Sequence, residues 1–335
     1  MLKYIGMDAH SSTCTFCVTD AIGREIDNVT LATNGKVIKN YLQSITGTKK
    51  LTFEECELSH WLYGIVKPEV DELIICNPVA NESYKKAKND KIDARKLAKM
   101  LRGDYLVPVF HDGSDRERFR KLVSSYQDII DEGTSIKNRY KSLFRKNGQR
   151  IKGKTLYNDE SLLESFKHND DQFIGGQLFS LLETLEKSRQ AHVKEILRYS
   201  KKFKELKYIK SVPGIGDINA AKIVAQVVNP YRFESKYKYY SYCGLVRHSR
   251  TSADKSYGSV KIWGNKTLKT VYKMAGHSVL NINTNNAFVA YYNSLCKKGV
   301  TDKNAYNAVC RKIAAITLSL WKHSKCFDES LIQAM

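Results

Sequence analysis

Strand and helix signals alternate through the first hundred residues, and this alternation constrains the fold more than any other feature of the chain. A short apolar strand pattern at 2–8 is followed by two patterns that predict a hairpin, at 12–20 and 24–33. Three amphipathic helix patterns then alternate with two strand patterns; the helices are at 34–45, 58–70 and 91–103, and the strands are at 49–55 and 71–78. This order predicts an α/β layer, although periodicity does not determine the order of the strands.

Long helices with few breaks are predicted from 113 to 205. Apolar residues near heptad spacing form two stripes, one from Phe119 to Phe144 and the other from Leu178 to Phe203. Two such helices, joined through a polar stretch at 152–159, predict an antiparallel coiled coil. We therefore expect three domains: an α/β domain at 1–112, a coiled coil at 113–205 that serves dimerisation and nucleic-acid contact, and a mostly helical domain at 206–335.

The last third opens with a glycine-containing turn between two helix patterns, YIKSVPGIGDINAAKIVAQV (208–227). Pro213, Gly214 and Gly216 favour a tight turn, and a second helix is predicted from Asp217, so the segment is typical of a helix-hairpin-helix. Backbone N–H groups at such a helix start can hold a nucleic-acid phosphate, with Gly214, Gly216 and Lys222 as candidates. The alternative is a plain turn between two packed helices.

The chain is strongly basic, with 55 Lys and Arg against 35 Asp and Glu and a formal net charge of +20. This balance favours a polyanionic partner, and nucleic acid is favoured over an acidic membrane surface. No run of eighteen apolar residues exists, and the start MLKYIGMDAH lacks the longer apolar stretch of a signal peptide. We expect a soluble, cytoplasmic protein associated with the nucleoid.

Positive charge is concentrated between 137 and 154, where eight basic residues occur without an acid. Such a run is costly in self-repulsion unless an anion lies against it, although a solvated face is the alternative. The candidate nucleic-acid contacts in this stretch are Lys137, Arg139, Lys141, Arg145, Lys146 and Arg150.

The eight cysteines are scattered, mostly in apolar segments, as reduced core residues are. Cys14 and Cys17 form the only CxxC, and they fall within a predicted strand. Residues three apart on a strand point to opposite faces, so this pair is not expected to hold a metal ion or to form a redox site.

Four acids in the first hundred residues carry the chemistry. Asp8 and Glu54 end apolar strand patterns, and Asp90 and Asp93 are spaced to share one face of a helix. An α/β layer can bring all four together, where two Mg²⁺ ions would activate a nucleophile and stabilise a leaving oxygen, with Mn²⁺ as the alternative metal. Taken singly, each acid has a structural explanation as a strand end, an ion-pair partner or a helix cap. His10 is interpreted as a surface or packing residue.

Several segments resemble the DEDD transposases of insertion sequences, which are relatives of the Piv invertases. They are YIGMDAH, FEECELSHWLY, IICNPVANESYKKAKNDKIDARKLAKMLRG, SVPGIGDINAAKIVAQV, YRFESKYKYYSYCGLV and VKIWGN. The resemblance covers essentially the whole chain. It implies a RuvC-like (ribonuclease-H-like) first domain whose Asp-Glu-Asp-Asp tetrad maps onto Asp8, Glu54, Asp90 and Asp93. At the second position Glu54 matches the family pattern better than Glu55 or Glu57.

The same resemblance implies a serine in the C-terminal domain that forms a phosphoserine link with DNA, beside metals held by the acids of another subunit. Ser252 is the best match, with Thr251 and Ser249 as alternatives. Arg247 and Ala253 depart from the proline and glycine of the family pattern. Lys255 and Lys261 are candidate phosphate contacts.

The resemblance further implies guidance by a structured non-coding (bridge) RNA and a homo-oligomer, a dimer that assembles to a tetramer. The predicted function is thus a metal-dependent transposase or site-specific DNA recombinase acting on donor and target DNA. The alternatives are a structure-specific nuclease of the Holliday-junction type, which would not need the serine, and a non-catalytic nucleic-acid-binding protein.

Overall fold

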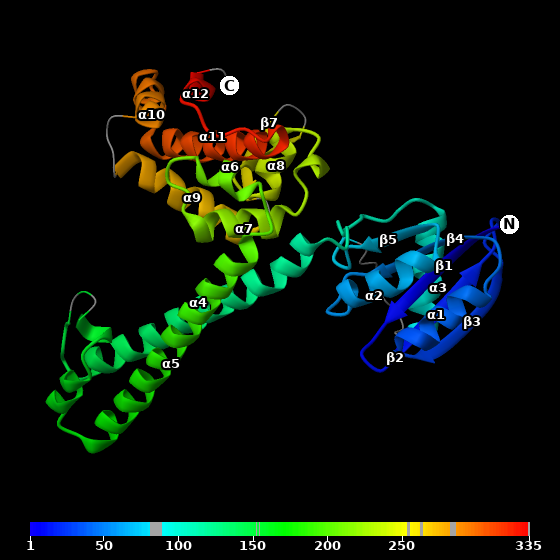
Figure 1. Ribbon diagram of the computed structural model, residues 1–335, viewed down its shortest axis with the longest axis horizontal. Coiled ribbons are helices and arrows are strands. Elements are labelled where there is room, and N and C mark those ends of the chain that lie inside the picture. The colour runs from blue at the N-terminus through cyan, green and yellow to red at the C-terminus, as the bar shows by residue number, and fades with distance from the viewer. Residues whose placement is uncertain are drawn as a thin grey trace. The chain divides into compact units, whose positions relative to one another are not determined.

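The computed structural model describes residues 1–80, 89–151, 153, 155–252, 255–261, 264–281 and 286–333. The side chains of 248–251, 256, 261, 331 and 333 lie outside this description. The chain divides into two units, Met1–Ser114 and Asp115–Met335. The first is a mixed α/β unit and the second is mostly helical, as the sequence predicts at this level (Figure 1).

A five-stranded mixed sheet forms the centre of the first unit. Its strands are β1 (Leu2–Ala9), β2 (Thr13–Thr19), β3 (Glu25–Ala32), β4 (Thr48–Glu54) and β5 (Glu72–Cys76). They lie in the order β3-β2-β1-β4-β5. The first three strands pair antiparallel, as the predicted hairpin requires, and β4 and β5 extend the sheet in parallel with β1.

Helices cover both faces of this sheet. Helices α1 (Gly35–Ser44) and α2 (Ser59–Val66) pack on one face, where apolar side chains of β1, β2 and β4 form a buried core. The predicted helix at 58–70 ends earlier, because Pro68 lies in a 3-10 turn, η1 (Lys67–Glu69). Helix α3 (Asp90–Arg102) packs on the opposite face, over Cys17. Cys14 belongs to the first core, so the two thiols of the CxxC do face opposite sides.

Gly6 of β1 determines how closely α3 approaches the sheet. A Cβ atom at this position would lie 2.0 Å from the carbonyl oxygen of Ala94 and 2.4 Å from the backbone nitrogen of Ala98. Both distances are far below van der Waals contact, so only glycine lets the helix backbone rest directly on the strand. This close contact positions the first turn of α3 beside the end of β1.

Two 32-residue helices, α4 (Asp115–Lys146) and α5 (Asn169–Ser200), lie along each other in the second unit (Figure 1). Between them the chain forms the short turns η2 (Thr155–Tyr157) and η3 (Glu160–Ser165). Apolar side chains from both helices and both turns form a separate small core that includes Tyr140, Phe144 and Phe179. A supercoil of the two helices stays a prediction.

The remaining helices pack with residues of α4 and α5 in the largest core of the described residues. They are α6 (Leu206–Lys210), α7 (Asp217–Val227), η4 (Pro230–Arg232), α8 (Lys236–Tyr242), α9 (Lys266–Asn281), α10 (Ala287–Lys297), α11 (Asp302–His323) and α12 (Ser330–Gln333). A hairpin of β6 (Arg247–Ser252) and β7 (Lys255–Lys261) leaves this bundle between α8 and α9. No helix in the described ranges combines the length and apolar character that a membrane span needs.

Candidate active site

The four acids singled out in the sequence line one cavity of the first unit. Its volume is about 230 Å³. The lining residues are Asp8, His10, Glu54, Asp90, Asp93, Lys96 and Leu97. They come from three segments that are distant in the sequence, so the cavity exists only in the folded unit.

The alternation of β1 and β4 places the first two acids on the same face of the sheet. Ile5 and Met7 of β1 point into the core beneath α1 and α2, so Asp8 points to the α3 side. In β4, Phe53 belongs to that same core and Glu54 follows it. The two strands are parallel neighbours, with Met7 paired to Phe53, and their terminal carboxylates therefore reach the same edge.

The first turn of α3 supplies the other two acids. Asn89 caps the helix, its side chain accepting a hydrogen bond from the backbone nitrogen of Lys91 at 3.0 Å. Asp90 and Asp93 follow within the first turn, where the helix dipole favours negative charge. Their spacing turns both side chains towards the cavity, as predicted for a helix.

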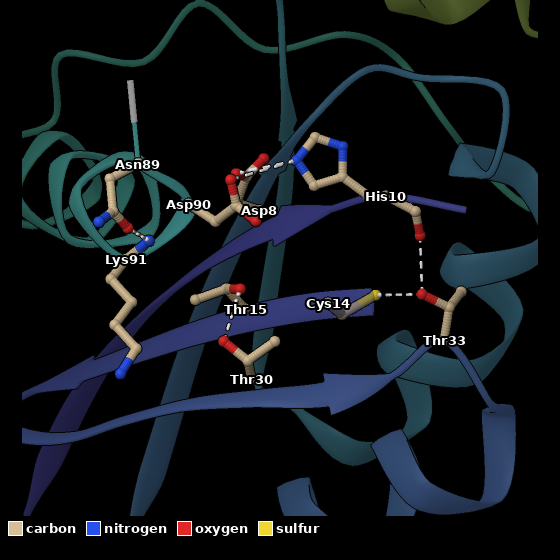
Figure 2. A network of polar contacts seen from close by, with 9 residues as sticks. All are labelled: Asp8, His10, Cys14, Thr15, Thr30, Thr33, Asn89, Asp90 and Lys91. Carbon is tan, nitrogen blue, oxygen red and sulfur yellow. Dashed lines mark hydrogen bonds and ion pairs between the residues drawn. The ribbon is translucent and has the colours of Figure 1, made fainter. Parts of the chain in front are cut away.

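His10 completes the cluster. Its side chain is exposed, as expected for a surface residue, but the sequence interpretation did not place it beside the acids. Its Nε2 lies 3.3 Å from Oδ2 of Asp8 and 3.9 Å from Oδ1 of Asp90 (Figure 2). One ligand atom from each of these three residues falls within 4.8 Å of the others. The turn after β1 is held by a 2.7 Å hydrogen bond from Oγ1 of Thr33 to the backbone oxygen of His10. The sequence signal was the two-residue spacing, which puts residues 8 and 10 on one side of an extended chain.

Burial and the neighbouring charges of the cluster shift the pKa of Asp8. Burial raises the pKa of its carboxyl group above the ordinary value, His10 lowers it in part, and the negative charges of Asp90 and Asp93 raise it again. The side chain of Asp8 is only 21% exposed, whereas that of Asp90 is 54% exposed. The carboxylates therefore repel one another in a partly desolvated cavity, and a cation bound there relieves the repulsion.

The two neighbouring glutamates point elsewhere. Oε2 of Glu55 lies 2.6 Å from Nε2 of His111, whose side chain is 5% exposed. Glu57 is exposed in the turn after β4 and does not line the cavity. Of the three glutamates in this segment, Glu54 is the one that lines the cavity.

Family models match both parts of the chain. Residues 5–148 match a transposase model of the IS110 DEDD type. The matched range includes the three segments that line the cavity. Residues 206–293 match the transposase model of the IS116/IS110/IS902 family. The chain belongs to the IS110 family of DEDD transposases. It is an enzyme that cleaves and rejoins DNA, and DEDD transposases are typically metal-dependent. No curated protein matches the chain.

In the transposase, Ser252 lies in the second unit. It is the last residue of β6, is exposed, and pairs across the hairpin with Lys255, which is also exposed. Ser249, Thr251 and Lys261 belong to the same hairpin, but their side chains lie outside the described residues. No part of the described geometry assigns a role to Ser252, so the nucleophile stays a prediction.

The glycine turn of the second unit has a packing reason. Gly214 has a φ of +82°, and a Cβ there would lie 2.7 Å from the backbone oxygen of Ala275 in α9. Gly216 precedes the first turn of α7 as its cap. Nζ of Lys222 donates to Oε1 of Gln127 at 2.9 Å, so this amine is engaged inside the unit. A phosphate contact at this turn stays a prediction.

The basic stretch is largely exposed. Arg145 and Arg150 are exposed and Lys141 is half-buried, and all three line a second cavity of about 790 Å³ beyond the end of α4. Lys137, Arg139 and Lys146 are exposed on α4 itself, and Nζ of Lys137 lies 5.5 Å from the centre of the Tyr157 ring. Lys152 and Lys154 lie outside the described residues. Nucleic-acid binding by this stretch stays a prediction.

Proposed function

We propose that this transposase is a site-specific recombinase that excises and inserts a mobile element, with Asp8, Glu54, Asp90 and Asp93 holding Mg²⁺ or Mn²⁺. The observation that carries the proposal is the meeting of these four acids in one cavity. The strand order β3-β2-β1-β4-β5, with acids at adjacent ends of β1 and β4, supports a RuvC-like assignment for the first unit. Replacing Asp8 with asparagine, which removes one of the proposed ligand charges, tests this metal site through the rate of DNA cleavage.

The residues around the cavity suit a hard divalent cation. Carboxylate oxygens are the ligands that Mg²⁺ and Mn²⁺ prefer, and the mutual repulsion at Asp8 is relieved by positive charge. When bound, such an ion would stabilise negative charge on the oxygens of a phosphodiester during displacement. The protein's own part is to fix the ligands: the sheet holds Asp8 and Glu54, and α3 carries the other pair. Lys96 also lines the cavity and offers a positive charge to a phosphate there.

His10 is proposed as a nitrogen ligand, which changes the metal preference of the site. Imidazole suits transition metals such as Mn²⁺ better than Mg²⁺, which favours oxygen ligands. Replacing His10 with alanine is therefore expected to weaken Mn²⁺ binding by about tenfold and Mg²⁺ binding less. Isothermal titration with each metal measures the difference, and the exposed His277 of α9, changed to alanine, is the control. No loss for either metal would show that His10 does not bind the ion, and equal losses would contradict its proposed preference for Mn²⁺.

Ser252 is proposed as the nucleophile that makes the reaction reversible without an energy source. Its Oγ attacks phosphorus, a phosphorus–oxygen bond to deoxyribose breaks, and the leaving oxygen takes up a proton while the hydroxyl proton passes to a base. A deoxyribose hydroxyl of another strand then attacks the phosphoserine, the bond from Oγ to phosphorus breaks, and the serine regains a proton. Each step exchanges one phosphoester bond for another. The family resemblance implies that the metals beside the serine are held by the acids of another subunit, and a composite site that uses two subunits is proposed on that basis.

Replacing Ser252 with alanine is expected to abolish the covalent protein–DNA adduct and strand exchange, while DNA and metal binding stay unchanged. Denaturing gel electrophoresis of labelled DNA and mass spectrometry of the attached peptide measure the adduct. Ser259 on the facing strand β7, changed to alanine, is the matched control. An adduct that persists in the Ser252→Ala variant moves the nucleophile to Thr251 or Ser249. Cleavage without any adduct in the wild type favours the Holliday-junction type of nuclease.

The basic stretch of α4 and the cavity beyond it support the proposed partner, a structured guide RNA. A protein that leaves sequence reading to base pairing needs mainly backbone contacts, which arginine and lysine provide. Arg145 and Arg150 in the 790 Å³ cavity are the proposed contacts. A homo-oligomer, a dimer assembling to a tetramer, is proposed because the composite site needs two subunits. The nucleic acid that copurifies with the protein identifies the guide.

A further inference from the structure

Lys312 of α11 is a buried cation outside the candidate active site. Its relative exposure is 7%, and no other lysine or arginine of the described ranges falls in the buried class. The helix around it contributes Ile313 and Ala314 to the largest core of the described residues. Burying an ammonium group is costly unless a partner compensates for the lost hydration.

Three other partly buried lysines of the same unit each have a hydrogen-bond acceptor, whereas Lys312 has none among the described residues. Their Nζ atoms donate as follows: Lys222 to Oε1 of Gln127 at 2.9 Å, Lys273 to Oδ1 of Asn307 at 2.9 Å and Lys322 to the backbone oxygen of Phe233 at 2.8 Å. Among the described residues, the amine of Lys312 has only the ring of Tyr291, at 5.4 Å from its centre. A ring face is a weak substitute for a hydrogen-bond acceptor or a carboxylate.

The surroundings of this amine are basic. Burial lowers the pKa of Lys312, and the positive charge of Lys236 on α8 lowers it further, with no carboxylate acting against them. Arg311 adjoins Lys312 on α11, and its charge reaches Tyr240 of α8. The contact between α8 and α11 thus gathers positive charges around an amine that, among the described residues, has no carboxylate partner, an arrangement that an external anion would stabilise.

An exposed aromatic ring lies beside these charges. Tyr237 follows Lys236 in the sequence, and its side chain is 68% exposed. It packs edge-on against Tyr240, with ring centres 6.0 Å apart and an angle of 90° between the planes. Nζ of Lys236 lies 5.7 Å from the centre of the Tyr237 ring, so the ring and one of the proposed phosphate contacts are neighbours, and most of the Tyr237 side chain stays open to solvent. An exposed ring held in this way suits stacking with an unpaired base.

We propose that Lys312 and Lys236 bind a phosphate of a single-stranded nucleic acid and that Tyr237 stacks on a neighbouring base. The inference rests on the proposed function, since it supplies that recombinase with a strand-binding site away from the carboxylate cavity. The shared chemistry is the phosphodiester of an unpaired strand. DNA exposed during strand exchange and an unpaired part of a guide RNA are the two sources, and the experiment separates them.

The test is the salt dependence of binding by the full chain, measured in EDTA with labelled single strands of DNA and of RNA that share one sequence. Methionine at Lys312 keeps the length and apolar character of the side chain but removes the charge. The Lys312→Met variant is expected to bind several-fold more weakly, with a slope of log affinity against log salt that is shallower by about 0.7. Lys236→Met is expected to act in the same way. Tyr237→Ala is expected to weaken binding about tenfold without changing the slope.

Thermal unfolding separates this role from a structural one. Because an uncompensated buried charge is removed, Lys312→Met is expected to unfold at the same temperature as the wild type or a higher one. Lys303→Met, at an exposed position of the same helix, is the matched control. It should leave the unfolding temperature unchanged and should change the salt slope less than Lys312→Met does. The strand whose slope changes, DNA or RNA, identifies the source of the phosphate.

An unchanged slope with both strands, or a large fall in the unfolding temperature of Lys312→Met, would overturn the inference. The readout is independent of the carboxylate cavity, because the measurements need neither metal nor cleavage. Repeating them in the Asp8→Asn background shows this directly. If Lys312→Met no longer changes the salt slope in the Asp8→Asn background, the proposed strand-binding site is contradicted. If only the metal mechanism is wrong, the salt slopes still differ between wild type and Lys312→Met.

Discussion

Replacing Asp8 with asparagine is expected to lower DNA cleavage and rejoining by about 10²- to 10⁴-fold, which corresponds to the several kilocalories per mole that a metal contributes to such a step. Asparagine keeps the shape of the side chain but removes the charge that a divalent cation needs. The single-turnover cleavage rate of a DNA substrate, measured with saturating Mg²⁺, checks this result. The Asp93→Asn variant is expected to behave in the same way, because its carboxylate lines the same cavity.

Although Asp8→Asn is expected to cleave DNA more slowly, its stability without metal is expected to equal or exceed that of the wild type. The raised pKa of Asp8 means that its charged form is disfavoured in the folded state, so that at neutral pH the metal-free wild type loses stability through this group. Without metal, the variant should unfold at the same temperature or a higher one. Mg²⁺ should raise the unfolding temperature of the wild type but not that of the variant. Glu132→Gln, at an exposed position of α4, is the control for removing one acid. Full cleavage by Asp8→Asn would remove Asp8 from the active site.

Replacing Gly6 with alanine is expected to lower the free energy of unfolding by about 3 kcal/mol, at the upper end of the cost of overpacking. The new methyl group would meet the backbone of α3 at Ala94 and Ala98, and backbone cannot move aside as a flexible side chain can. The helix must shift away from β1, and Asp90 and Asp93 shift with it. We therefore expect cleavage and metal binding to be lost even where the variant stays folded. Urea denaturation and metal titration measure the two effects.

Gly64 in α2 is the matched control in the same unit. A Cβ there meets nothing within 4 Å, so Gly64→Ala is expected to be neutral or to stabilise the helix by up to about 1 kcal/mol. If Gly6→Ala folds with wild-type stability and cleaves DNA normally, the close contact between β1 and α3 does not position the acids.

Local periodicity was sufficient to predict where the four acids lie relative to their own elements. The apolar patterns predicted that Asp8 and Glu54 each end a strand, and the spacing of Asp90 and Asp93 predicted one face of a helix. The pairing of β1 with β4 could not be read from these patterns, since it depends on contacts between residues distant in the sequence. The role of Gly6 was missed for the same reason: its neighbours in space come from α3.

The basic part of the cavity was not predicted either. His10 follows the end of β1, and a single histidine gave no reason to place it against Asp90. Lys96 follows Asp93 by one helical turn, a spacing that would have placed both on the same face. Lys312 was hidden by its position in an otherwise apolar helix, where sequence alone does not show that the amine lacks an acceptor.

The most direct test of the carboxylate site is the number of Mn²⁺ ions that the full chain binds, counted by electron paramagnetic resonance of free Mn²⁺ during titration. The wild type and Glu132→Gln are expected to bind Mn²⁺ equally well, whereas Asp8→Asn and Asp93→Asn are expected to lose this binding. Asp8→Asn and Asp93→Asn proteins that bind the same number of ions with the same affinity as the wild type would contradict the assignment of the cavity as the metal site.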